Sequence, residues 1–198
     1  MQLLEKTLSA PAEDLALDEA LLLQAESGQA GEVLRLWERP DYAVILGSGC
    51  VLAEEVDEAA CAREGVPVLR RSSGGGTVLL GPGCLAFSLV LSFEDHPALA
   101  AIRPSYVWIL SRLAAALQGL IDAQPAGTSD LSQGGKKFSG NSQQRKRRYL
   151  LHHGTLLYDF DLSKVSRYLR EPPRQPEYRQ GRRHADFLCN LGCSRAEL

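Results

Sequence analysis

The stretch RRSSGGGTV, residues 70–78, combines two arginines, two serines and three consecutive glycines. Glycine loses more backbone freedom on folding than any other residue, so three in a row between ordered segments indicate that another group approaches the main chain closely. Bare backbone N–H groups beside arginines are suited to holding a phosphate or a carboxylate. The alternative is a plain glycine turn between two strands, with the arginines as ordinary surface residues.

Two common nucleotide-binding motifs do not account for this stretch. A P-loop requires Gly-Lys-Ser/Thr after its glycines, whereas Gly76 is followed by Thr77 and Val78. The sequence GPGCLA at 81–86 fits a relaxed dinucleotide fingerprint, but that fingerprint must open a helix, and residues 85–93 are rich in strand-forming residues. We therefore predict a loop between two strands.

A second stretch that could carry chemistry is SDLSQGGKKFSGNSQQRKRRYLLHHGTLLYDFDL, residues 129–162. It contains an acid, Asp130, a Gly-Gly turn, a lysine pair at 136–137 and a His-Gly-Thr sequence that opens an apolar strand. Taken alone, the lysine pair is typical of a solvated hairpin tip and Asp130 of a turn cap. His152 and His153 are more typical of one packed and one exposed histidine than of a metal pair.

Hydrophobic periodicity predicts the elements that position these stretches. Helices are expected over residues 12–27, 53–63, 105–121 and 162–169. Strands are expected over 33–37, 43–46, 66–69, 77–80, 85–93, around Phe138 and over 150–158, the first two pairing across the ERPDY turn. The third helix carries an apolar stripe made of Val107, Leu110, Leu113, Ala114, Leu117 and Ile121.

These elements predict an α/β (α+β) fold with a mixed, largely antiparallel sheet whose outer face is covered by the helices. Residues 1–198 are expected to form a single domain, and no C-terminal accessory domain is evident. The pocket is expected between the loop at 70–78 and the hairpin at 130–154.

The composition and net charge exclude some classes of function. The chain is 44% hydrophobic with a formal net charge of −2, so no overall basic field attracts nucleic acid or anionic membranes. The apolar runs are too short to span a bilayer and the N-terminus lacks a signal-peptide core, so we expect a cytoplasmic protein. Five cysteines predict reduced thiols. No metal site is predicted, because His184, Cys189 and Cys193 have no evident fourth ligand.

Together the two stretches resemble the lipoate–protein ligase family, whose catalytic domain is shared with biotin–protein ligases and octanoyltransferases. The resemblance follows chain order through LALDEALL, ILGSG, EGVPVLRRSSGGGTV, GKKFSGNSQ and HHGTLLYDFDL. It implies a catalytic domain of the biotin/lipoate-ligase type.

The resemblance also implies a site built from both stretches, with Lys137 as the essential catalytic lysine. The residues implied to bind ATP and the acyl-adenylate are Arg71, Gly75, Gly76, Thr77, Val78, Leu79, Asp130 and Lys137. The residues implied to form the acyl pocket are Ser73, Gly74, Gly140, His153, Gly154 and Thr155.

The implied reaction uses ATP and Mg²⁺ to convert lipoate or octanoate to an acyl-adenylate, and then transfers the acyl group to an acceptor lysine. The implied acceptors are lipoyl-carrier domains of 2-oxoacid dehydrogenase complexes or the glycine-cleavage H protein. Acyl carrier protein and a separate accessory subunit are further partners that the resemblance allows.

Two departures from the ligases keep an alternative open. GGGTV continues into LLGPGC, which is closer to the octanoyltransferase branch, and the chain ends at Leu198 soon after FLCNLGC. The alternative is an octanoyl/lipoyl transferase that works without ATP through a thioester on Cys189. A third possibility is a non-catalytic relative, against which the intact Lys137 and glycine loop argue.

Residues 143–149, QQRKRRY, form the one concentrated basic run. It is a solvated loop, or a segment that closes over the adenylate or meets an acidic carrier domain. Interleaved aromatic residues are nearly absent, which argues against nucleic-acid stacking.

Overall fold

A computed structural model describes all 198 residues. The strands are β1 (Gln2–Glu5), β2 (Val33–Glu38), β3 (Ala43–Leu46), β4 (Val68–Arg70), β5 (Val78–Leu80), β6 (Cys84–Ser92), β7 (Gln124–Ala126), β8 (Asp130–Gln133), β9 (Lys136–Arg145) and β10 (Tyr149–Leu157). The helices are α1 (Pro11–Glu26), α2 (Leu52–Glu55), α3 (Glu58–Glu64), α4 (Ile102–Ala116), α5 (Ser163–Tyr168) and α6 (His184–Phe187), with 3-10 turns η1 (Pro97–Leu99) and η2 (Glu177–Arg179).

The strands form two sheets. The larger has seven strands in the order β1-β2-β6-β10-β9-β8-β7, and the smaller has three in the order β4-β3-β5. In the larger sheet only β1 and β2 are parallel, and in the smaller sheet β3 is parallel to β4 and antiparallel to β5. The predicted fold class, a mixed and largely antiparallel α/β fold, is therefore confirmed, with the strands divided between two sheets.

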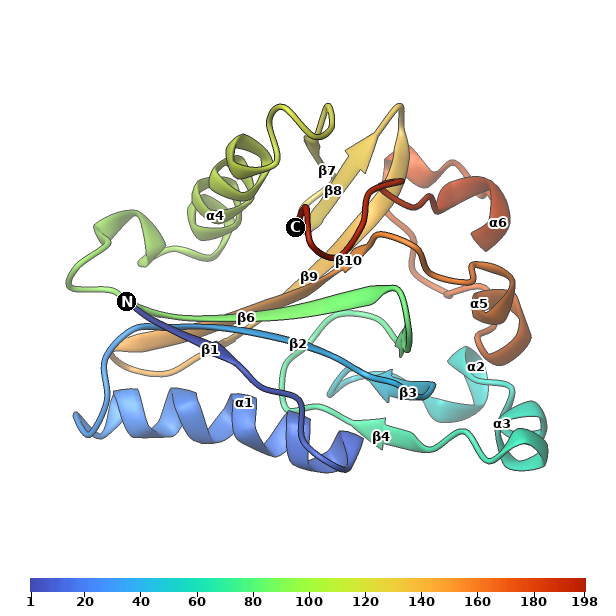
Figure 1. Cartoon of the computed structure of the whole chain (residues 1–198), viewed down its shortest axis with the longest axis horizontal. Helices are drawn as coiled ribbons and strands as arrows, with labels where there is room; N and C mark the ends of the chain where they lie inside the picture. Colours follow the sequence, from blue (N-terminus) through green and yellow to red (C-terminus); the bar gives the residue numbers. More distant parts are fainter.

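Strands β6 and β10 are apolar on both faces. Val90 and Leu151 pack with α1, whereas the adjacent Leu91 and Leu150 pack with α4, because neighbouring strand residues point to opposite faces. Helices α1 and α4 consequently lie on opposite sides of the larger sheet (Figure 1). The prediction that the helices cover a single outer face was wrong.

The smaller sheet lies on the α1 side of the larger one (Figure 1). Ile45, Leu79, Trp37, Leu157 and Phe160 belong to the core cluster that joins the two sheets. Strand β3 is buried throughout. Because β3 belongs to this second sheet, the predicted pairing of residues 33–37 with 43–46 was wrong.

Two helix predictions also need correction. The helix predicted over 53–63 is divided, since Val56 forms a bridge with Leu169 and the Asp57 carboxylate accepts the N–H of Ala60 to begin α3. Helix α4 ends at Ala116, and Val107 of the predicted stripe is 65% exposed.

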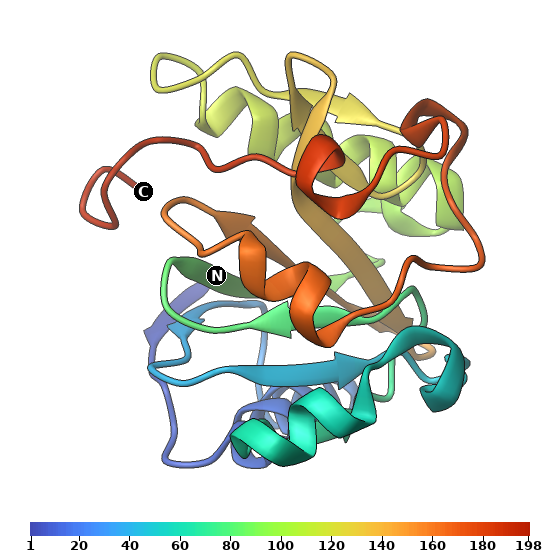
Figure 2. The same cartoon turned by 90° about the vertical axis from the view of Figure 1, so that its right-hand side faces the viewer.

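Helix α5 (orange) and helix α6 (red) lie on the same side of the molecule as α2 and α3 (Figure 2). The backbone N–H of Arg170, just after α5, donates to the carbonyl of Glu55 and so fixes this side. None of the helices has the length and apolar character needed to cross a membrane.

Candidate functional site

A cavity of about 230 Å³ lies between the two sheets. On one side it is bounded by residues 71–77, which we call the glycine loop, and on the other by β9 and β10. The predicted residues that line it are Arg71, Gly75, Gly76, Thr77, Val78, Leu79, Asp130, Lys137, Gly140, His153, Gly154 and Thr155. Ser73 and Gly74, predicted to form the acyl pocket, and Cys189 lie outside the lining.

Lys137 projects toward the cavity from β9, and its Nζ lies 2.9 Å from Oδ1 of Asp130. Asp130 is 5% exposed, and its other carboxylate oxygen accepts a 2.7 Å hydrogen bond from the hydroxyl of Tyr178. The sheet register shifts between Leu131 and Ser132, so Ser132 pairs with Lys137. The result is a half-buried ammonium group held at the cavity wall by a buried carboxylate.

The glycine loop presents free main-chain donors. The N–H of Arg71 donates to Leu46 and that of Thr77 to Glu55, whereas the N–H groups of residues 72–76 donate to no protein acceptor. Gly75 has φ +83°, a left-handed conformation that favours glycine. Consecutive free N–H groups of this kind can bind an anion.

The guanidinium of Arg71 folds back under the glycine loop. It donates to Oγ of Ser73 at 2.9 Å, to the carbonyl of Gly76 at 2.8 Å and to the carbonyl of Ile45 at 3.3 Å. Burial lowers the pKa of Arg71. Arg71 therefore organises the loop by donating to its carbonyl groups and to Ser73.

His153 connects the glycine loop to α1. Its Nε2 is 2.6 Å from Oγ of Ser73, and its Nδ1 is 3.7 Å from Oδ2 of Asp18. Asp18 also accepts hydrogen bonds from Ser88 at 2.6 Å and Arg35 at 2.7 Å. Asp18 was not among the predicted site residues. The sequence pattern that could have indicated a buried Asp18 is its spacing from Asp14, four residues earlier, on a helix face shared with Leu21 and Leu22.

Residues 170–198, which follow α5 and which we call the C-terminal segment, also line the cavity, through Arg179, His184, Phe187 and Leu188. The sequence after Pro172–Pro173 is polar and irregular, so no local periodicity marked these residues. Burial lowers the pKa of both Arg179 and His184.

None of the five cysteines lines the cavity. Sγ of Cys189 lies 3.6 Å from the carbonyl of Lys136, and burial raises the pKa of its thiol. Burial also raises the pKa of Cys84 to about 12. No group of three His, Cys, Asp or Glu side chains is placed to hold a metal ion.

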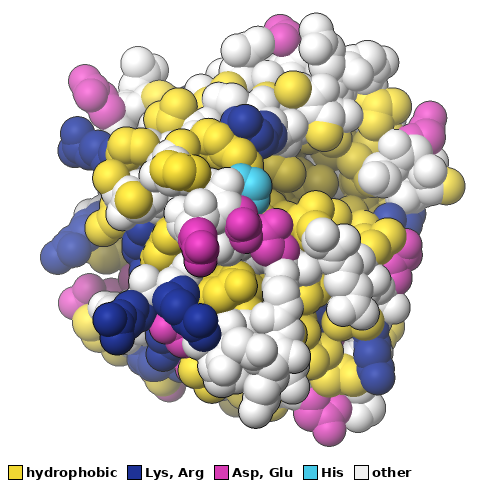
Figure 3. All heavy atoms as spheres, turned by 90° about the vertical axis from the view of Figure 1, so that its left-hand side faces the viewer, with side chains coloured by type: hydrophobic (Ala, Val, Ile, Leu, Met, Phe, Trp, Pro, Cys, Tyr) yellow, Lys and Arg dark blue, Asp and Glu magenta, His cyan; other side chains and the backbone are white.

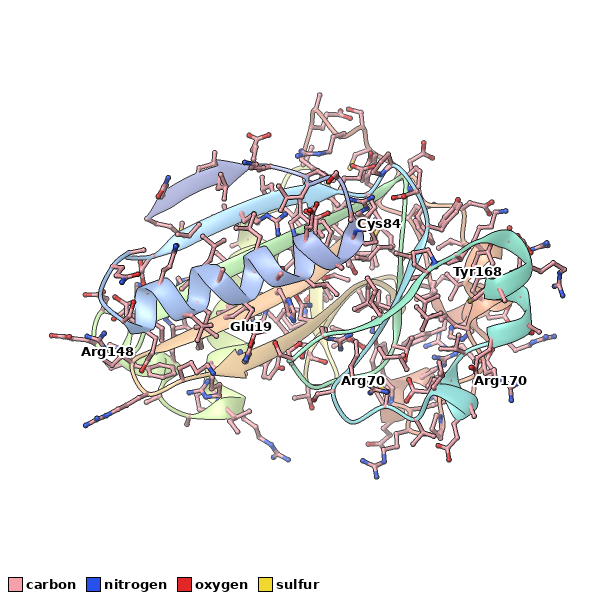
Figure 4. The ribbon with its side chains drawn as sticks, turned by 90° about the horizontal axis from the view of Figure 1, so that it is seen from below. Glu19, Arg70, Cys84, Arg148, Tyr168 and Arg170 are labelled. Carbon is pink, nitrogen blue, oxygen red and sulfur yellow. The ribbon has the colours of Figure 1, made fainter.

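The basic run lies at the β9–β10 turn, at the opposite end of β9 from Lys137. Arg145 donates to the carbonyls of Leu99 and Ala100, and the Glu26 carboxylate accepts the backbone N–H of Arg148. Figure 4 shows Arg148 beside the end of α1. The run does not line the cavity. On the face in Figure 3, acidic, basic and apolar side chains are interspersed.

The sequence matches the lipoyl protein ligase A/B catalytic domain over residues 10–191. It is 36% identical to octanoyltransferase LipM of Carboxydothermus hydrogenoformans, over 80% of this chain and 65% of that protein. It is 30% identical to lipoate-protein ligase A of Blochmanniella floridana, over 85% of this chain and 48% of that protein. The chain thus spans about half to two thirds of the length of these relatives.

Two solved structures have the same fold over 99% of this chain. One is lipoate-protein ligase A bound with ATP, with a TM-score of 0.75, 25% identity and 79% of that chain covered. The other is a bipartite lipoate protein ligase studied with its E2 lipoyl domain from Thermoplasma acidophilum, with a TM-score of 0.72, 26% identity and 78% covered. The motifs, the cavity that they form and these matches show that the chain belongs to the lipoyl protein ligase A/B catalytic domain family, which includes lipoate-protein ligases and octanoyltransferases.

Proposed function

We propose that this chain carries the catalytic site of an ATP-dependent lipoate–protein ligase. It activates lipoate or octanoate as an acyl-adenylate and transfers the acyl group to a lysine of an acceptor protein. One observation carries the proposal: the cavity combines free loop N–H groups and the ammonium of Lys137 with an apolar wall, and no cysteine lines it.

The apolar part of the cavity suits an acyl chain. Ile45, Val78, Leu79, Leu157 and Phe160 all line it, beside the polar groups of the glycine loop and β9. Ligand sites are commonly apolar clefts with a few convergent polar groups that fix orientation. In this arrangement the acyl chain lies against the apolar wall, with its carboxylate directed toward Lys137.

The first step needs positive charge near the α-phosphate. The acyl carboxylate oxygen bonds to the α-phosphorus while the bond to the β-phosphate oxygen breaks, and pyrophosphate leaves. Negative charge then builds up on the α-phosphoryl oxygens, where preorganised donors contribute most to the rate. Lys137 and the N–H groups of Gly75 and Gly76, which line the cavity, are such donors, and lysine acts as a compact charge that follows the phosphate.

ATP would bring Mg²⁺, which proteins bind through one or two carboxylates together with phosphate oxygens. Asp18 and Asp130 are the carboxylates that line the cavity. Protein donors engage both carboxylates, Arg35 and Ser88 at Asp18 and Lys137 and Tyr178 at Asp130. Asp130 lies beside the lysine that would meet the phosphates, so it is the residue that would hold Mg²⁺.

In the second step the acceptor's amine attacks the acyl carbonyl and AMP leaves, so the enzyme supplies orientation and no nucleophile. As the Thermoplasma ligase was studied with an E2 lipoyl domain, we propose lipoyl-carrier domains or a glycine-cleavage H protein as acceptors. The five free cysteines suit the reducing cytoplasm, which we propose as the location.

The test is ATP–pyrophosphate exchange with lipoate, octanoate or biotin as the acid. We expect exchange with lipoate and octanoate, a loss of more than about 100-fold in Lys137→Ala, and retention in Cys189→Ala. Lys136→Ala is the matched control, because this neighbouring lysine is exposed and lies outside the cavity.

The second candidate is a thioester-forming octanoyltransferase, which the similarity to LipM favours. It needs a reactive thiolate, whereas burial raises the pKa of Cys189 and its thiol faces a backbone carbonyl. ATP-independent transfer from octanoyl-acyl carrier protein, abolished in a cysteine variant and retained in Lys137→Ala, would replace the ligase assignment with this one.

A further inference from the structure

We propose that Tyr178 is a positioning residue for Lys137 and that it acts through Asp130. The inference rests on the proposed function of the cavity, because it concerns the placement of the lysine that contacts the phosphate. Tyr178 comes from the C-terminal segment, outside both sequence stretches that carry the family motifs.

The first support is the geometry of the three side chains. The two oxygens of Asp130 have separate partners: Oδ2 accepts the Tyr178 hydroxyl at 2.7 Å, and Oδ1 lies 2.9 Å from Nζ of Lys137. A carboxylate held at both oxygens cannot rotate freely, so the direction in which Oδ1 holds the ammonium is fixed. Without the phenol, rotation of the carboxylate would allow Nζ to take several positions.

The second support is that the Tyr178 ring is itself held in place. The centroid of the ring lies 5.2 Å from that of the Phe187 ring. The backbone carbonyl of Tyr178 accepts a 2.8 Å hydrogen bond from the Arg182 side chain. Gly127, with φ +56°, leaves room for the ring, because a Cβ there would lie 3.3 Å from Cε1 of Tyr178. Burial and the nearby Asp130 carboxylate raise the pKa of Tyr178, so its hydroxyl stays a donor at neutral pH.

The third support is that the same segment holds the main chain of Lys137. The N–H of Cys189 donates to the carbonyl of Lys137 at 2.9 Å, and Leu188 forms a parallel bridge with Lys137. The C-terminal segment therefore fixes Lys137 at its backbone directly and at its ammonium through Tyr178 and Asp130.

Tyr178→Phe removes only the hydroxyl and keeps the ring. Tyr158→Phe is the matched control, since Tyr158 donates to the Glu38 carboxylate at 2.9 and 3.0 Å and lies outside the cavity lining. We expect kcat for pyrophosphate exchange to fall about tenfold in Tyr178→Phe, with KM for ATP changed less than about twofold, because the lost interaction matters mainly in the transition state. Tyr158→Phe should leave both unchanged, and an unchanged kcat in Tyr178→Phe would overturn the proposal.

A double-mutant cycle tests whether Tyr178 acts through Asp130. In an Asp130→Asn background, Tyr178→Phe should cause no further loss, since the pathway is already broken. If the tenfold loss persisted in that background, Tyr178 would act by another route and the proposal would be wrong. Melting temperatures of the variants check that each is folded.

A measurement without ATP separates this proposal from the proposed function. The rate at which an amine-acylating reagent modifies Lys137, followed by mass spectrometry, reports how firmly the ammonium is held. We expect modification several-fold faster in Tyr178→Phe than in wild type or Tyr158→Phe. Equal rates would refute the positioning role. Absence of exchange activity in wild type would instead show that this chain alone does not form the acyl-adenylate, and the labelling rates would still decide the role of Tyr178.

Discussion

Gly140 lies so close to Lys137 that a Cβ at this position would be 2.7 Å from Nζ and 2.8 Å from Cε of the lysine. The obstructed atoms belong to the end of a flexible side chain, so a methyl group here would displace the lysine and leave the backbone in place. The absence of a side chain at Gly140 is therefore what lets the ammonium reach Asp130.

Gly140→Ala should separate activity from stability. We expect pyrophosphate exchange to fall at least about 100-fold, because small misplacements of a reacting group are costly. The free energy of unfolding should change by less than about 1 kcal/mol. Gly31→Ala, where a Cβ meets nothing within 4 Å, is the control. Wild-type exchange in Gly140→Ala would show that the observed position of Lys137 is not required.

Gly47 presents a different constraint, because a Cβ there would lie 2.0 Å from the carbonyl oxygen of Gly75. The carbonyl oxygen and carbon of Gly75 that this Cβ would strike belong to the main chain, so Gly47→Ala must move the glycine loop. We expect KM for ATP to rise by about tenfold or more and the melting temperature to fall, measured by exchange kinetics and thermal unfolding. An unchanged KM together with a lowered melting temperature would mean that the loop N–H groups do not bind the nucleotide.

The fold class and the location of the pocket could be predicted because the motif residues are contiguous and strand and helix periods differ. The glycine loop, Asp130, Lys137 and His153 fall in two short stretches, and the structure brings these stretches to one cavity. The roles assigned to these residues stay predictions until activity is measured.

Tyr178 and Asp18 could not be predicted with the same rules. Tyr178 lies in the short 3-10 turn η2 and reaches Asp130 through long-range packing of the C-terminal segment, and such contacts leave no local pattern. The predicted pairing of β2 with β3 was wrong for a related reason. A short turn with Pro40 suggested a hairpin, but Arg39 in this turn is buried against Asp14, and the chain then passes to the second sheet.

Asp14 supports the fold beneath the cavity. Its carboxylate pairs with Arg35 and, at 2.9 Å, with Arg39, and all three side chains are at most 1% exposed. Asp14→Asn leaves two buried guanidinium groups with a weaker partner, so we expect a loss of about 3–5 kcal/mol in the free energy of unfolding. Glu5→Gln is the control, since Glu5 is 63% exposed and lies 3.9 Å from Arg195. Equal urea midpoints for the two variants would contradict this account.

We expect His152 to make the stability of the protein depend on pH. The side chain is fully buried; Gln143 lies 3.1 Å from its Nδ1 and Oδ1 of Asn141 lies 3.2 Å from its Nε2, a pattern that suits the neutral ring with its proton on Nε2. Burial lowers the pKa of His152 from 6.5 to about 3. The unfolded chain therefore takes up a proton below pH 6.5 that the folded chain does not.

The contribution of His152 to the free energy of unfolding is therefore fully present above pH 6.5. It is lost as the pH falls toward 3, by up to about 1.4 kcal/mol per pH unit. Between pH 7.5 and 5.0, we expect it to remove about 2 kcal/mol from the free energy of unfolding. His152→Gln, which cannot take up this proton, should lower stability at pH 7.5 and show a correspondingly smaller loss on acidification. Urea unfolding of both proteins at the two pH values measures the difference. An identical loss in both would mean that other groups cause the acid sensitivity and that His152 is not the buried neutral base.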